Sequence, residues 1–169
     1  EHSKLSKRNG DASFQDLVAK GYLPGAILNY IALLGWSPTE DREIFTLDEL
    51  VQAFDVKHIG TSGAIFDPEK LKWVNGMWLR NMDLDSYEKL VTPYIDEAVK
   101  GNFNRRQIAA ILQQRAQTLA EIPEMLTFFD NFPSYSNDLF INKKMKTDPT
   151  IALKSLQASY EALKNQEDW

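Results

Sequence analysis

The sequence predicts an all-α protein, and three observations support this prediction. Polar capping residues recur three positions ahead of an acidic or amide side chain, which is the spacing of a helix N-terminal capping box. Apolar residues behind these caps repeat at intervals of three and four, as on one face of a helix. Alternation of apolar and polar residues, which is typical of strands, hardly occurs over the 169 residues.

Four short helices are expected in the first half of the chain. Each begins at a cap or at a proline of the first turn, and these starts are Ser13, Pro24, Thr46 and Asp67. Gly21 ends the first helix and Gly35 the second, because glycine readily adopts the left-handed conformation that closes a helix.

Three helices follow in the second half. Their expected starts are Asp85, Asn104 and Asp148. The first of them ends at Gly101, and the second runs to about Ala120, ahead of Pro123. Residues 131–142 combine a proline with several Ser and Asn residues, so a loop is expected there.

The composition excludes several classes of protein. With 43% hydrophobic and 25% charged residues, the chain is too apolar to be disordered and can bury a core. The absence of cysteine excludes a disulfide scaffold and a thiolate zinc site, and two histidines leave little for a metal site. No apolar run approaches the roughly 20 residues that span a bilayer, so a cytoplasmic protein with no membrane partner is expected. The formal net charge of -5 means that any nucleic-acid site is local.

A basic segment opens the chain. Lys4, Lys7 and Arg8 lie within five residues, and Asn9-Gly10 after them permits a tight turn. Clustered cations on a flexible backbone can close over a polyphosphate and stabilise the charge of a leaving pyrophosphate. On composition alone, a solvated basic segment is the favoured interpretation.

The residues Lys-Leu-Ser-Lys-Arg at positions 4–8 resemble the KMSKS loop of class I aminoacyl-tRNA synthetases, in the form found in bacterial glutamyl-tRNA synthetases. The sequence after this loop is also similar to that family, and the matching stretches are residues 21–24, 28–30, 33–37, 66–67, 70–71, 73 and 75. The order of these stretches along the chain makes the resemblance specific to this family. The resemblance is strong to about Arg80 and looser beyond it.

The resemblance implies a division of the chain at residues 82/83. Residues 1–82 would form the KMSKS loop and the helices that contact the tRNA stem, and residues 83–169 an incomplete helical anticodon-binding bundle. In the loop, the resemblance makes Lys4 and Lys7 the catalytic residues, with Ser6, Lys7 and Arg8 on the ATP and Mg²⁺ accompanying the ATP. The implied reaction joins glutamate to ATP as glutamyl-adenylate and then transfers it to tRNA.

One apparent motif is rejected. His58-Ile59-Gly60-Thr61 looks like the HIGH motif of class I synthetases, but it follows the KMSKS-like loop instead of preceding it, and no strand or glycine-rich turn surrounds it. His58 is therefore expected at the surface or partly packed. Since no βαβ pattern is present, most of the ATP and glutamate site is missing, and the chain is not expected to aminoacylate by itself. We expect it to be a piece of a longer protein.

A local positive charge is expected in the second half. Between Glu97 and Glu121 there is no acidic residue, although the stretch includes Lys100, Arg105, Arg106 and Arg115. RNA phosphates could bind there. Arg105 and Arg106 are expected to contact phosphates, with a solvated helix face as the alternative. The cluster of Lys143, Lys144 and Lys146 is more simply a solvated loop.

Arg115 stands out on this segment. If residues 104–119 form one helix, Arg115 lies in the middle of its apolar stripe, where a guanidinium cannot remain buried without a partner. It would pair with Glu121 or Asp130, extend its head to water, or emerge at a concave surface and bind unstacked RNA. The resemblance implies that an arginine at this position contacts the third anticodon base. For Arg115, a structural role and a functional role are therefore given equal weight.

The aromatic residues are expected mainly in the core. Helical spacing places Trp36, Trp73 and Trp78 there, and Phe128 and Phe129 are more simply core residues than base-stacking platforms, as is Tyr135.

Three functions compete. The leading one is the C-terminal part of a glutamate–tRNA ligase acting as a monomer on the glutamate tRNA, with ATP and L-glutamate as substrates in the full-length enzyme. Whether the glutamine tRNA is also a substrate stays open. The alternatives are a freestanding helical tRNA-binding module and a structural interaction domain that does not bind RNA.

Overall fold

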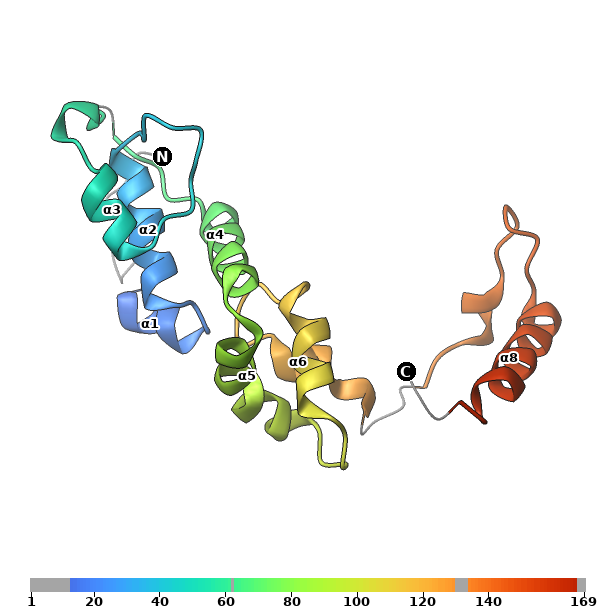
Figure 1. Cartoon of the computed structure of the whole chain (residues 1–169). Helices are drawn as coiled ribbons and strands as arrows, with labels where there is room; N and C mark the ends of the chain where they lie inside the picture. The colour runs from blue at the N-terminus through green and yellow to red at the C-terminus, as the bar shows by residue number, and fades with distance from the viewer. Residues whose placement is uncertain (1–12, 62, 130–133, 167–169) are drawn as a thin grey trace. The chain divides into compact units, whose positions relative to one another are not determined.

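The computed structural model describes residues 13–61, 63–129 and 134–166. Over these ranges the protein is helical, and the β-structure consists of two isolated bridges, Trp36 with Ile59 and Asn142 with Thr147. The all-α prediction is therefore confirmed. The chain separates into two compact units, Glu1–Asn131 and Phe132–Trp169, each described here by itself (Figure 1). The division at 82/83 remains a prediction.

The first three helices begin and end close to where the sequence predicts. They are α1 (Phe14–Ala19), α2 (Pro24–Gly35) and α3 (Leu47–Ala53). Both expected capping boxes are formed: Ser13 pairs with Asp16, and Thr46 pairs with Glu49, each side chain satisfying the other's backbone N–H.

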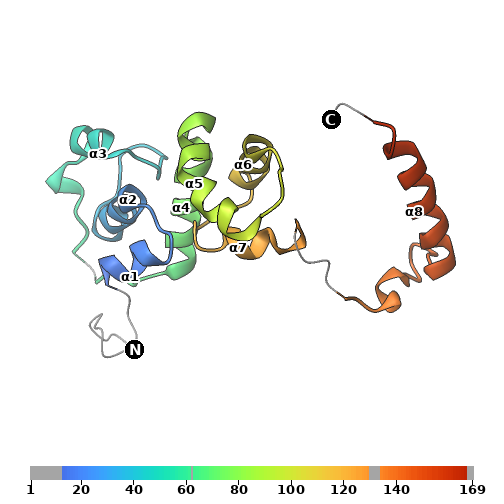
Figure 2. The same cartoon turned by 90° about the horizontal axis from the view of Figure 1, so that it is seen from below.

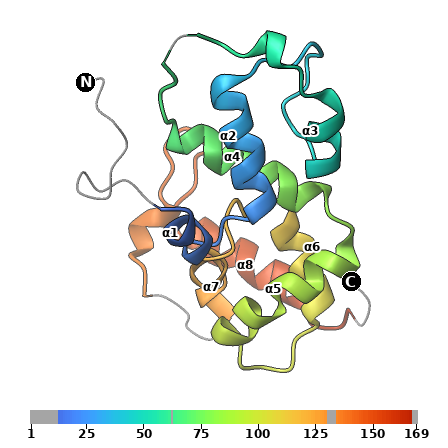
Figure 3. The same ribbon diagram turned by 90° about the vertical axis from the view of Figure 1, so that its left-hand side faces the viewer.

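Helix α4 (Pro68–Asn81) packs against α2 (Figure 3). Asp67 caps it as expected, accepting from the N–H groups of Glu69 and Lys70. One face of α4 joins the core cluster of α1 and α2, which includes Ile27, Tyr30, Leu71 and Val74, and Leu79 joins a second cluster with the helices that follow. α4 thus connects the two clusters inside the first unit.

The second cluster is built by α5 (Leu84–Ala98), α6 (Arg105–Gln113) and the short α7 (Ile122–Met125), with α5 packed on both of the others (Figure 2). Its most deeply buried members include Tyr87, Val91, Ile95 and Ile122.

Three of the expected boundaries are wrong. Helix α5 ends at Ala98, with Val99 as its C-cap, and so stops short of Gly101. The cap of α5 is Asp83, whose carboxylate accepts from the N–H of Ser86 at 2.9 Å. Asp85 lies inside the first turn of the helix, and its side chain pairs with Arg106. Helix α6 ends at Gln113 and does not reach Ala120. It ends because the N–H groups of Gln117 and Thr118 donate to the Glu121 side chain and not to the carbonyls four residues back.

The second unit consists of a 3₁₀ turn (Asn137–Phe140) and α8 (Pro149–Leu163). Asp148 caps α8 as expected, accepting from the N–H of Ile151 at 2.8 Å. Residues 134–136 form a loop, as predicted, and the 3₁₀ turn interrupts the rest of that stretch. None of the described residues of this unit is buried. Within the described parts of the chain, no helix has the length and apolar character that crossing a membrane requires.

Candidate functional site

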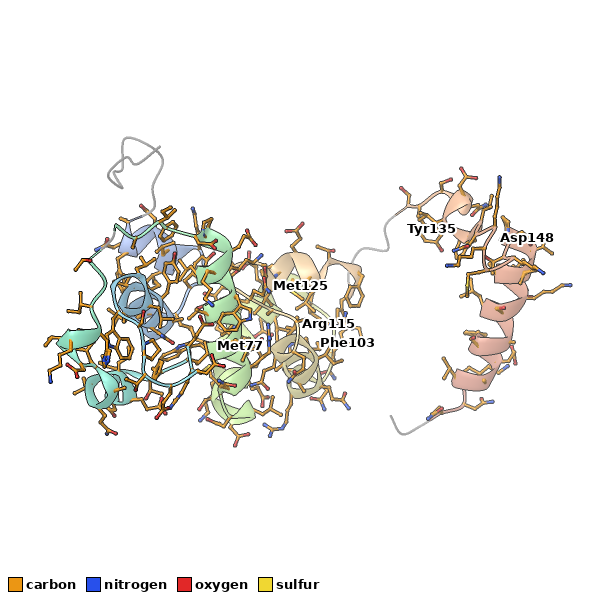
Figure 4. The ribbon with its side chains drawn as sticks, turned by 90° about the horizontal axis from the view of Figure 1, so that it is seen from above. Met77, Phe103, Arg115, Met125, Tyr135 and Asp148 are labelled. Carbon is orange, nitrogen blue, oxygen red and sulfur yellow. The ribbon has the colours of Figure 1, made fainter. Side chains whose placement is uncertain are left out.

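Arg115 lies on the turn that connects α6 to α7, not inside a helix. Its side chain is exposed and lines an open hollow of about 410 Å³ with Gln117, Glu121, Glu124 and Met125. Figure 4 shows Arg115 beside Met125 at this surface. The expectation that Arg115 emerges at a concave surface therefore fits the geometry.

A second, apolar hollow of about 140 Å³ is also lined by Arg115. Its walls come from α6, α7 and the 3₁₀ turn Thr127–Phe129, and they include Ile111, Met125 and Phe128. Ile111 is 63% exposed and Phe128 is 59% exposed. A charged fork between a polar and an apolar hollow is suited to a ligand that has both an aromatic face and anionic or polar edges, such as a nucleotide.

The turn that bears Arg115 is fixed by hydrogen bonds from distant parts of the chain. Asn75 on α4 donates to the carbonyl of Gln117 at 2.5 Å and accepts from the N–H of Leu23 at 2.8 Å. The N–H of Leu119 donates to the carbonyl of Gly21 at 3.0 Å. Because Asn75 is fully buried, these bonds are shielded from water, and the turn is held in place before any ligand arrives.

The Glu121 side chain stabilises the α6–α7 turn through hydrogen bonds and an ion pair. Its carboxylate accepts from the N–H groups of Gln117 and Thr118 and pairs with Lys72 on α4 at 3.2 Å. Burial acts to raise the pKa of Glu121, but the two backbone N–H donors and Lys72 outweigh it, and the pKa is lowered. Glu121 therefore stays ionised at neutral pH and keeps the turn closed.

The structure describes one of the two carboxylates that were expected to pair with Arg115, and that one is bound elsewhere. Glu121 is bound to Lys72 and to the backbone, so the proposed pairing of Arg115 with Glu121 is wrong. Asp130, the other expected partner, lies outside the described residues. Within residues 13–61, 63–129 and 134–166, no carboxylate is within ion-pair distance of the Arg115 guanidinium.

Arg105 stabilises the loop between α5 and α6 through hydrogen bonds. Its guanidinium donates to the Asp96 carboxylate at 2.7 Å and to the carbonyls of Val99, Gly101 and Phe103 at 3.0 to 3.1 Å. The side chain is 26% exposed, so it is not the solvated residue of the alternative interpretation. Its donors are already occupied within the protein.

Arg106 is exposed but paired with two carboxylates of α5, Asp85 at 2.6 Å and Glu88 at 2.8 Å. These pairs raise the pKa of Arg106, with the Asp85 hydrogen bond as the largest cause. Carboxylates of α5 therefore neutralise Arg105 and Arg106 in space, whereas no described carboxylate neutralises Arg115.

The residues of the KMSKS-like loop, Lys4, Ser6, Lys7 and Arg8, lie outside the described residues, so their expected contacts remain predictions. Among the residues that the structure describes, no group of three His, Asp or Glu side chains is placed to hold a metal ion, and we assign no magnesium ligand to them.

The prediction that the aromatic residues lie in the core is confirmed for some of them and wrong for others. Trp36 is buried, and Trp78 is half-buried with its Nε1 donating to Asn29 at 3.0 Å, as expected for core residues. Trp73 is 36% exposed and lies under the Lys70 ammonium at 4.3 Å from the ring centre, so its assignment to the core is wrong. Phe128 and Tyr135 are also exposed, contrary to expectation. His58 is at the surface, as expected.

Sequence reasoning missed the residues that fix the turn. Asn75 lies among the apolar positions Leu71, Val74 and Leu79 of α4, and a polar side chain in such a stripe is a signal of a buried hydrogen-bonding role. Lys72 and Gln117 gave no comparable signal, because their partners are distant in the sequence.

Comparison with known families gives two matches. Residues 84–169 match the family described as "Anticodon binding domain", and residues 1–73 match the family described as "tRNA synthetases class I (E and Q), catalytic domain". The α6–α7 turn and Arg115 fall in the first match, and the KMSKS-like loop falls in the second.

Individual relatives extend over the whole chain. The glutamate–tRNA ligase of Clostridium acetobutylicum is 49% identical over 169 residues, which cover 99% of this chain and 35% of the relative. That of Clostridium tetani is 50% identical over 168 residues, covering 99% of this chain and 34% of the relative. The chain thus spans about a third of the length of these relatives.

Solved structures agree with the sequence comparison. The crystal structure of a glutamate tRNA ligase from Elizabethkingia meningosepticum in complex with its amino acid matches with a TM-score of 0.74 and 26% identity, covering 99% of this chain and 36% of that chain. The glutamate–tRNA synthetase of Elizabethkingia anophelis matches with a TM-score of 0.71 at 26% identity, over 98% of this chain and 36% of that one. The chain belongs to the glutamate–tRNA ligase family of class I aminoacyl-tRNA synthetases and includes that family's anticodon binding domain.

Proposed function

We propose that this chain is the RNA-holding portion of a glutamate–tRNA ligase, and that Arg115 is its contact with the anticodon. One observation carries the proposal: within the residues that match the anticodon binding domain, Arg115 presents an exposed guanidinium, without a carboxylate partner among the described residues, on a turn fixed by α4 and Gly21. Its planar fork can bind a base edge of unstacked RNA, and the apolar hollow beside it can accept the face of a base.

In the whole protein, the proposed reaction activates glutamate with ATP and transfers it to the glutamate tRNA. Lys4 and Lys7 would act on the ATP phosphates with Ser6 and Arg8, because clustered cations stabilise the charge that develops on a leaving pyrophosphate. The match of residues 1–73 to the catalytic-domain family supports this assignment. Mg²⁺ would be bound mainly by the ATP phosphates, as is usual for this ion.

Arg105 and Arg106 are less suited than Arg115 to contact the RNA. Arg105 has its donors on Asp96 and three carbonyls, and Arg106 is neutralised by Asp85 and Glu88. A phosphate contact by either residue would require these bonds to be shared. We therefore assign the RNA contact to Arg115 and leave Arg105 and Arg106 in their bonds within the protein.

We place the protein in the cytoplasm as a monomer, with the glutamate tRNA as its RNA partner. The match of residues 84–169 to the anticodon binding domain supports the RNA partner.

The test is a titration of the chain with a glutamate tRNA transcript and with its anticodon-stem hairpin, at low and moderate salt. Arg115→Gln should weaken binding to both by about tenfold or more, because a charge-assisted contact is lost. Arg106→Gln is the matched control, since it removes the same charge from the neighbouring helix, and it should leave binding nearly unchanged.

The variants separate the competing explanations. Arg115→Lys keeps the charge but not the planar fork, so binding intermediate between that of the parent and of Arg115→Gln would indicate base-edge recognition. Equal loss in Arg115→Gln and Arg106→Gln would instead indicate a diffuse electrostatic contact. If the parent chain does not bind the transcript at low salt, the proposal fails.

A further inference from the structure

Arg80 is the second arginine of the described residues that lacks a carboxylate partner. The structure describes five arginines, and ion pairs hold Arg42, Arg105 and Arg106. Arg80 lies near the end of α4, half-buried, and its Nε is buried without a hydrogen-bond acceptor. Its Nη1 meets only the sulfur of Met77, at 3.5 Å, which is a weak acceptor.

The Arg80 guanidinium lies near Gln117, one of the residues that line the hollow with Arg115, although Arg80 is not itself among the lining residues. A Cβ placed on Gly76 would come within 3.1 Å of the Arg80 Nη2 and within 3.3 Å of the Gln117 Cγ, so these two side chains meet over Gly76. Gln117 in turn lines the 410 Å³ hollow together with Arg115. Gln117 therefore lies near both of the arginines that lack a carboxylate partner among the described residues.

Gly76 makes this arrangement feasible. A glycine in the middle of a helix is less favourable than alanine by about 1 kcal/mol, so its presence in α4 needs a packing reason. The absence of a side chain leaves the room that the Arg80 guanidinium and the Gln117 side chain fill.

The charge balance around the hollow leaves Arg80 uncompensated. Two described carboxylates line the hollow. Glu121 is already satisfied by Lys72 and by two backbone N–H groups, and Glu124 forms no ion pair with Arg80. A partly desolvated guanidinium without a counter-ion is unfavourable, and an anion that arrives with a ligand removes this penalty. Under the proposed function, that anion is a phosphate.

We infer that Arg80 binds a backbone phosphate of the same RNA whose anticodon Arg115 contacts, with Gln117 near both arginines. This inference rests on the proposed function. Arg115 would read the base, and Arg80 would fix the position of the strand.

Arg80→Met should weaken RNA binding but should not destabilise the RNA-free chain. Binding of the glutamate tRNA transcript should weaken by about tenfold at low salt, and the slope of log K against log salt should become shallower by about 0.7 to 0.9, the change for one phosphate contact. The Tm of the RNA-free chain should stay the same or rise, because an uncompensated, partly buried charge is replaced by an apolar side chain of similar length. A purely structural arginine would give the reverse.

Arg106→Met is the matched control, because it removes a charge that is already paired and should leave the salt slope unchanged. Arg80→Gln provides a second variant if Arg80→Met does not fold, with the same expected change in slope. If the parent binds the transcript and Arg115→Gln weakens binding, but both folded Arg80 variants bind with the parent's affinity and slope, the inference is overturned and the proposed function stands. If the parent does not bind, both are overturned.

Discussion

At the scale of single residues, some buried polar groups in the core of the first unit have hydrogen-bond partners and others do not. The side chain of Asn29 is fully buried and bonded to the backbone of Glu43 and Phe45 and to Trp78. The hydroxyl of Tyr87 is equally buried but has no hydrogen-bond partner among the described residues. Each unsatisfied buried group destabilises the folded state, so these two residues should respond differently to substitution.

We expect Tyr87→Phe to leave the free energy of unfolding at pH 7 unchanged or to raise it, because the variant removes a buried hydroxyl that bonds nothing. Burial, and then the charge of Glu121, raise the pKa of Tyr87 to about 12. Since the folded pKa lies above the ordinary value, the protonated tyrosine favours folding below pH 10, and that contribution is lost between pH 10 and 12. Urea denaturation at pH 7 and pH 11 measures both effects, and the variant should lose less stability at pH 11.

Tyr30→Phe is the control for this prediction. The Tyr30 hydroxyl accepts from the N–H of Asp67 at 2.6 Å, so its removal leaves that N–H without its acceptor and should cost about 1 to 2 kcal/mol. If Tyr87→Phe destabilises the chain as much as Tyr30→Phe does, the Tyr87 hydroxyl has a partner in solution and the prediction is wrong.

At the scale of elements, the α6–α7 turn depends on a close approach to the loop after α1. Gly21 has a φ of +83°, and a Cβ there would meet the backbone nitrogens of Ala120 and Leu119 at 2.4 and 2.6 Å. Gly21→Ala should therefore destabilise the chain by more than about 2 kcal/mol, since both the strained φ and the clash with backbone act against it. Thermal denaturation followed by circular dichroism gives the value.

Gly35→Ala is the matched change at a permissive position, because a Cβ at Gly35 meets nothing within 4 Å. It should alter the Tm little. Similar losses from both variants would mean that the clash at Gly21 is relieved by movement of the turn. In that event Gly21→Ala should also reduce the RNA affinity, because Arg115 moves with the turn.

The start of α5 gives another prediction at this scale. Asp83 caps the helix through the N–H of Ser86, whereas Asp85 is exposed and paired with Arg106. Asp83→Ala should lower the Tm by about 2 to 4 °C, because a lost N-cap leaves an N–H unsatisfied. Asp85→Ala should lower it less, since exposed ion pairs contribute little. Equal shifts in the two melting curves would contradict the assignment of the cap.

At the scale of the whole molecule, the buried hydrophobic residues that the structure describes all belong to the first unit. The three clusters of described residues extend from Leu17 to Leu126, and α8 in the second unit has no buried residue. Instead Ile151, Leu153 and Leu156 are each about half exposed. The cooperative unfolding of this chain should therefore be that of the first unit.

We expect a chain that ends at Asn131 to unfold cooperatively with a Tm close to that of the 169-residue chain. The shift should be smaller than the roughly 2–4 °C that 1 kcal/mol produces in a protein of this size. Calorimetry of both chains, with the helical signal of α8 followed separately by circular dichroism, makes the comparison. A much lower Tm for the shorter chain would show that residues 132–169 stabilise the first unit.

The sequence alone was sufficient for the local features of the fold and for part of the candidate site. The capping boxes at Ser13 and Thr46, the caps at Asp67 and Asp148 and the turn at Gly21 are determined by residues within four positions of one another. Such interactions can be recognised from spacing, because the backbone geometry of a helix end is fixed. Arg115 was singled out for a related reason, as an arginine at an apolar position of the helical repeat.

Tertiary structure decided the remaining features, because they depend on partners far away in the chain. Helix α6 ends at Gln113 because the turn after it is held by Glu121 and by Asn75, 42 positions before Gln117. The Arg106 charge is neutralised by Asp85, 21 positions earlier. The sequence by itself thus determined that the chain is helical and where most helices begin, since these depend on neighbouring residues. Which arginines remain without a carboxylate partner among the described residues was decided by the packing of α4, α5 and α6, because electrostatic compensation acts through space and not along the chain.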